Sequence, residues 1–126
     1  MKRLILAAGL TLGLAFGLAL GTAHPAAAQR AGTYDVTGAN PDGAQYTGTL
    51  VLEQIGMLSF RLTWTIGSDT IEGVGMVSGL TFATAFSLGG QPSMGIYEIK
   101  PDGEMVGQWT IMGAFGGGTE NLRLRP

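Results

Sequence analysis

The chain has 126 residues, of which 22 are glycine and none is cysteine, and its formal net charge is −2. A chain of this length forms one small domain with a single core. Without cysteine it has neither disulfides nor a thiolate nucleophile. The acidic balance disfavours nucleic-acid binding, because phosphate backbones are bound by clusters of Lys and Arg.

The first 28 residues have the pattern of a secretory signal peptide. A basic start, Met1-Lys2-Arg3, precedes an apolar run over 4–20, and small residues at 26–28 precede Gln29. We expect cleavage after Ala28, which leaves a mature β-barrel domain over 29–126. The alternative is an uncleaved anchor, since the run is close to the roughly 17 residues that a spanning helix needs. No cysteine follows the run, so a lipoprotein is excluded, and we predict export to the periplasm or the extracellular space.

The predicted mature chain contains no histidine, five basic residues and nine acidic residues, which gives it a net charge of −4. The lack of histidine excludes a Ser-His-Asp triad and an ordinary zinc site. A carboxylate pair of the glycosidase type remains open, with five glutamates as candidates by residue type: Glu53, Glu72, Glu98, Glu104 and Glu120. The first, second and fourth alternate with apolar neighbours and should face solvent, whereas Glu98 could face inward with a raised pKa. We predict a non-enzymatic protein without metal or cofactor.

Alternation of apolar and polar residues predicts eight strands and no helix. In the strongest segment, over 57–66, Leu58, Phe60, Leu62, Trp64 and Ile66 occupy every second position. On the last strand, Leu122 and Leu124 share one face. The other seven predicted strands cover 33–38, 45–54, 70–77, 80–88, 94–100, 104–112 and 120–125, with tight turns between most of them and a loose connection over 89–92.

Eight short strands joined by turns favour an up-and-down antiparallel β-barrel, with a two-sheet β-sandwich as the alternative. Four glycines fall on the apolar faces, where a large ring from a neighbouring strand can lie against the backbone: Gly48, Gly73, Gly75 and Gly107. The outward faces carry polar residues, which excludes a membrane-spanning barrel.

Five aromatic side chains are candidates for a ligand pocket at the barrel mouth: Trp64, Trp109, Phe82, Phe86 and Tyr46. For the tryptophans we favour core packing, because a domain this small needs the roughly 200 Å² of apolar area that each ring buries.

Two segments resemble each other. Gly32-Thr-Tyr34-Asp-Val36, followed by Pro41-Asp42-Gly43, matches Gly95-Ile-Tyr97-Glu-Ile99, followed by Pro101-Asp102-Gly103. An internal duplication and two independent solutions to one turn are both open.

The first of these segments, continued by Trp64-x-Ile66-Gly67, Gly107-x-Trp109 and Gly118-x-Glu120-x-Leu122, resembles a family of small exported bacterial proteins labelled fibronectin-binding. The resemblance covers nearly the whole mature chain. It implies an exported protein that contacts an extracellular-matrix or cell-envelope protein through the barrel surface or rim. By fold the chain is also similar to avidin-like and lipocalin-like barrels. The alternative function is therefore a carrier of a small apolar ligand, and a third is a periplasmic structural or inhibitory module.

Overall fold

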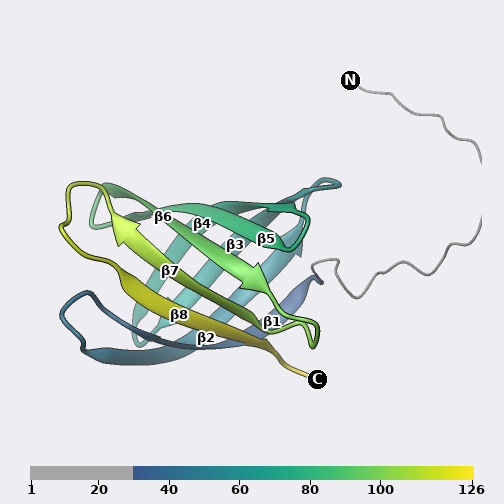
Figure 1. Ribbon diagram of the computed structural model, residues 1–126, viewed down its shortest axis with the longest axis horizontal. Coiled ribbons are helices and arrows are strands. Elements are labelled where there is room, and N and C mark those ends of the chain that lie inside the picture. Colours follow the sequence, from purple (N-terminus) through teal and green to yellow (C-terminus); the bar gives the residue numbers. More distant parts are fainter. Residues whose placement is uncertain (1–29) are drawn as a thin grey trace, which may run out of the picture.

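The computed structural model describes residues 30–126, so the predicted signal peptide over 1–28 lies outside the described residues. Eight antiparallel strands form a closed barrel in which each strand pairs with the next and β8 pairs with β1 (Figure 1). This confirms the predicted eight-stranded barrel and excludes the sandwich. Among the described residues, no helix is long and apolar enough to cross a membrane. The strands are β1 (Gly32–Ala39), β2 (Gln45–Gln54), β3 (Ser59–Ile66), β4 (Asp69–Ser78), β5 (Thr81–Leu88), β6 (Gln91–Ile99), β7 (Met105–Ile111) and β8 (Gly118–Leu124).

The alternation of residues decides which side chains enter the barrel. On β3, Phe60, Leu62 and Trp64 are buried, whereas Ser59 and Arg61 between them are exposed. The same alternation on the other strands fills the interior with one hydrophobic core, to which seven strands contribute buried side chains and β4 contributes the partly buried Ile71 and Val77. A closed sheet leaves no unpaired strand edge, which suits a small domain that lacks disulfides.

Two of the four glycines predicted to make room for aromatic rings, Gly75 and Gly107, do so. A Cβ atom added at Gly75 would lie 2.5 Å from Cζ of Phe82, and one added at Gly107 would lie 2.6 Å from Cδ2 of Tyr97. Each ring therefore occupies the space that a side chain would take on the glycine. Tyr46 lies against Gly38 and Trp109 against Gly118 in the same way. At Gly48 and Gly73, backbone carbonyl groups of neighbouring strands help to fill that space.

The two ends of the barrel differ in how they are closed. The β1–β2, β3–β4, β5–β6 and β7–β8 connections surround one end, which we call the mouth. The three remaining connections and the C-terminus lie at the opposite end, which we call the base (Figure 1). Phe60, Phe82, Ile99 and Met105 lie toward the base and are at most 2% exposed, so side chains close this end.

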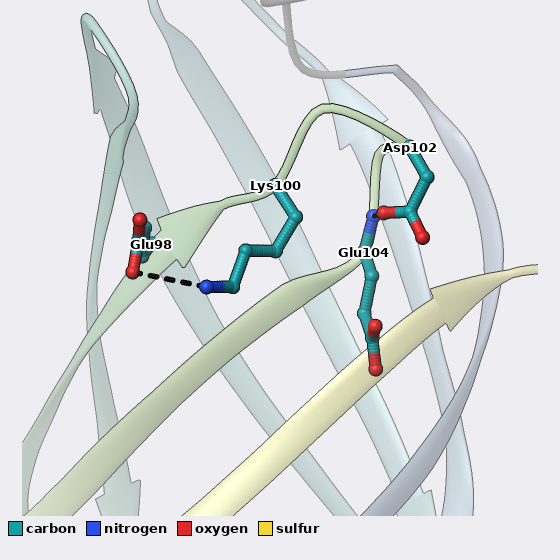
Figure 2. Close-up of polar contacts among 4 residues, drawn as sticks. All are labelled: Glu98, Lys100, Asp102 and Glu104. Carbon is teal, nitrogen blue, oxygen red and sulfur yellow. Dashed lines mark hydrogen bonds and ion pairs between the residues drawn. The ribbon is translucent and has the colours of Figure 1, made fainter.

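The two Pro-Asp-Gly turns have the same geometry. In Asn40–Ala44 the Asp42 carboxylate accepts the amide N–H two residues on at 2.9 Å, and in Lys100–Glu104 the Asp102 carboxylate does the same at 2.9 Å (Figure 2). Gly43 and Gly103 both have φ of 92°, which only glycine adopts easily. The first turn lies at the mouth and the second at the base, so the two similar segments do not form paired sites.

Three details differ from the sequence prediction. Leu58 and Leu80 are 53% and 54% exposed, because β3 and β5 each begin one residue after them. Residues 89–92 are not a loose connection. Gly89 and Gly90, with φ of 56° and 80°, form a two-residue turn, and β6 already begins at Gln91. Two successive positive φ values are the mark of a type I′ hairpin turn, whose twist matches that of the flanking strands.

Candidate functional site

A cavity of about 240 Å³ lies inside the barrel mouth. It is partly open to solvent and is bounded at its inner end by Tyr97 and Glu120, on strands β6 and β8. A more open depression along β1, β2 and β8 is bordered mainly by Thr and other polar residues. The mouth cavity is lined by Asn40, Tyr46, Trp64, Ile66, Asp69, Ile71, Phe86, Leu88, Tyr97, Trp109 and Glu120.

Four aromatic rings form one contiguous wall of the cavity. Phe86 is central, with its ring centroid 5.1 Å from that of Trp64 and 6.4 Å from that of Trp109. The ring of Tyr46 lies edge-on to Trp109 at 6.5 Å. These separations are those of favourable aromatic pairs, so each ring holds the orientation of the next.

A single carboxylate lies at the inner end of this wall. Oε2 of Glu120 accepts hydrogen bonds from the indole N–H of Trp64 and the hydroxyl of Tyr97, both at 2.9 Å. Oε1 accepts a hydrogen bond from the hydroxyl of Tyr46 at 2.7 Å. The Tyr46 oxygen in turn accepts the indole N–H of Trp109 at 2.9 Å. Five side chains from five strands are thus joined by one polar network at the bottom of an apolar cavity.

Burial of this carboxylate perturbs the titration of the network. Glu120 is 5% exposed, and its burial raises the pKa of its carboxyl group, although its three hydrogen-bond donors oppose the rise. Burial and the negative charge of Glu120 also raise the pKa of Tyr46 and Tyr97 above the ordinary tyrosine value. Both phenols therefore remain protonated and serve as donors.

The structure brings four of the five candidate pocket residues together at the cavity: Trp64, Trp109, Phe86 and Tyr46. Trp64 and Trp109 are only 4% and 8% exposed, so they fill the core and line the cavity at once. Phe82 does not reach the cavity. It packs toward the base, with its ring centroid 5.7 Å from that of Phe60. Alternation showed that Phe82 faces inward, but it does not give the height of a residue along the barrel.

Glu120 was a candidate by residue type alone, and sequence reasoning did not place it at the pocket. It lies two positions before Leu122 and four before Leu124, so the same alternation that turned those leucines inward also turned Glu120 inward. Glu98, which we considered as an inward carboxylate, is exposed on β6 and pairs with Lys100 at 3.4 Å (Figure 2). Glu53 and Glu72 are exposed, as expected, and Glu104 pairs on the outer face with Arg123 at 3.2 Å. Within residues 30–126, no three acidic or histidine side chains gather as a metal site would require.

Comparison with known proteins shows likeness of fold alone. No protein-family model matches the chain, and no curated protein matches it. A redesigned β-barrel is 20% identical with a TM-score of 0.66, and the match covers 80% of this chain and 96% of that one. The redesigned barrel mFAP1, solved bound to DFHBI, is 19% identical with a TM-score of 0.62, covering 75% and 94%. A mutant of the fluorescent protein UnaG is 15% identical with a TM-score of 0.51, covering 76% and 96%.

Proposed function

We propose that this protein is a non-enzymatic carrier that holds one small, mainly apolar molecule in the mouth cavity of its barrel. The observation that carries the proposal is the cavity itself, with about 240 Å³ enclosed by aromatic and aliphatic side chains around a few polar groups. A cavity of roughly 150 Å³ is enough to hold benzene. The cavity therefore has room for a single substituted ring and falls below the range of drug-sized ligands.

Two further observations support this assignment. The pocket walls are fixed before any ligand arrives, because the rings pack on one another and four polar groups are tied to Glu120 or to its partner Tyr46. Preorganised walls lower the entropic cost of binding. The structurally similar barrel mFAP1 holds a small molecule, so this architecture is compatible with such a role.

Contact with a matrix or envelope protein through the barrel surface ranks second. It rests on the family resemblance of the sequence, and no surface feature described above selects such a partner. Saturable binding of the purified protein to fibronectin or to envelope fractions would be needed to raise this function above the carrier.

The test is a titration of the purified protein with small aromatic probes, followed by tryptophan emission and by calorimetry. Because Trp64 and Trp109 line the cavity, binding should shift or quench their emission and should saturate at one probe per chain. Phe86→Leu, which alters the wall, should weaken binding. Phe82→Leu, which alters the core near the base, should lower stability and leave binding unchanged. Absence of saturable binding by every probe, neutral or charged, would refute the carrier.

A further inference from the structure

Glu120 is a buried acid whose interactions all come from neutral groups. Its three hydrogen-bond donors are two phenol hydroxyls and one indole N–H. The ion pairs of the described residues lie on the outside of the barrel, where Arg61, Lys100, Arg123 and Arg125 each pair with another carboxylate. No Lys or Arg is among the cavity-lining residues of the described chain. Buried charges in proteins are normally paired, and the carboxylate form of Glu120 would lack a cation.

The network favours the charged form of Glu120 by its geometry. The indole N–H of Trp64 can only donate, and the Tyr46 oxygen already accepts the indole N–H of Trp109. A protonated Glu120 would need an acceptor for its own O–H, and a phenol oxygen could serve only if its hydroxyl group turned away from the carboxyl group. The carboxylate form satisfies every donor at once.

One acceptor position of this carboxylate is unused and belongs to a residue that lines the cavity. Each carboxylate oxygen accepts about two hydrogen bonds. Oε2 accepts two, from Trp64 and Tyr97, whereas Oε1 accepts one, from Tyr46. A donor group in the cavity could complete the set at Oε1.

The cavity walls also suit positive charge. The faces of Trp, Tyr and Phe rings attract cations, with Trp the strongest, and the wall contains two Trp, one Tyr and one Phe. The exposed Asp69 adds a second carboxylate among the residues that line the cavity. Carboxylates and ring faces around a site without basic residues form an environment that favours a cation over an anion.

We propose that the natural ligand is a small organic cation, a protonated amine on an apolar body, whose N–H group donates to Oε1 of Glu120 while the body packs among Trp64, Phe86 and Trp109. This inference rests on the carrier function and specifies its ligand class. The cation would supply the charge partner that Glu120 lacks and would stabilise its carboxylate form. A neutral donor would fill the acceptor position but would not compensate the buried charge.

Three probes of nearly equal size separate charge from shape: phenethylamine as the cation, 2-phenylethanol as the neutral alcohol and phenylacetate as the anion. At a pH where the carboxylate is ionised, the amine should bind about tenfold or more tightly than the alcohol, and the anion should bind weakest. Lowering the pH should weaken this preference as Glu120 takes up a proton. The groups that face Glu120 are Tyr46, Trp64 and Tyr97, from β2, β3 and β6. Trp109 of β7 lies behind Tyr46, and Asp69 of β4 is among the cavity-lining residues.

Glu120→Gln should remove most of the preference for the amine while the alcohol still binds. Glu72→Gln removes the same charge from the exposed face of β4 and serves as the control, which should leave the preference intact. Circular dichroism would verify that each variant is folded. Equal binding of amine and alcohol, or an amine preference that Glu120→Gln leaves undiminished, would overturn the cation inference while the carrier stands. If no probe binds, the carrier function itself fails.

Discussion

Replacing Glu120 with Gln should change how the stability of the barrel depends on pH. Burial raises the pKa of Glu120 in the folded protein, so between the ordinary glutamate value and the raised one the folded chain binds more protons than the unfolded chain. The stability that this group contributes is therefore fully present below the ordinary pKa and is lost as pH rises through the raised value. Glutamine does not titrate, so the variant should lack this loss.

The size of the effect follows from linkage and from the contacts of the network. One proton taken up on folding changes the free energy of unfolding by at most about 1.4 kcal/mol per pH unit. Gln can place its carbonyl oxygen where Oε2 accepts from Trp64 and Tyr97, and the Tyr46 hydroxyl can turn to the Thr119 carbonyl oxygen, 3.4 Å away. The substitution then costs roughly one weakened hydrogen bond, about 1 kcal/mol.

The assay is urea unfolding, followed by far-ultraviolet circular dichroism, of both proteins across a series of pH values. The difference between the two curves isolates Glu120, because the two proteins are identical at every other position. Relative to the parent, the variant should gain stability as pH rises. A difference that is flat, or that favours the parent increasingly with pH, would show that the pKa of Glu120 is not raised by folding.

Two further predictions concern packing. Gly118→Ala would bring a Cβ atom to 2.5 Å from Cε2 of Trp109. We therefore expect urea titration to show a loss of about 1–3 kcal/mol in unfolding free energy, with a shifted tryptophan emission. Gly116→Ala is the control and should be neutral in the same titration, because its Cβ atom would meet only one atom, at 3.9 Å. Thr84 has a buried hydroxyl without a hydrogen-bond partner, so Thr84→Val should raise the thermal midpoint in calorimetry by the equivalent of about 1 kcal/mol or more. Thr65→Val, on the exposed face of β3, is the control and should not raise it. An unchanged or lower midpoint for Thr84→Val would contradict this prediction.

Local alternation was enough to predict the eight strands, their inward faces and the barrel. The β2 strand matches its predicted bounds, 45–54, because both of its ends are set by turn residues. Alternation also predicted that Gly75 and Gly107 face inward, and a glycine on an apolar face needs a neighbouring side chain to fill the space above it. These features depend on neighbours in sequence or on the period of a strand.

The site depends on quantities that alternation does not contain. Phe82 and Phe86 have the same inward orientation on β5, but their different heights place one in the core and the other at the cavity. Height follows from the register of all eight strands, which is set by pairing between distant segments. For Glu120, the alternation of β8 already indicates an inward side chain. The role of its carboxylate depends on Tyr46 and Trp64, which donate hydrogen bonds to it from more than 50 residues away in the sequence.

The pairing of β8 with β1 also affects the order in which the barrel can assemble. The last strand carries Glu120, whereas the donors of its three hydrogen bonds come from β2, β3 and β6. A folding intermediate that lacks β8 would hold Tyr46, Trp64 and Tyr97 with no common acceptor, and it would expose the edges of β1 and β7. Because contacts between the two ends of a chain form slowly, the step that closes the barrel is also the step that completes the binding site, and a chain with an open barrel has no pocket to fill.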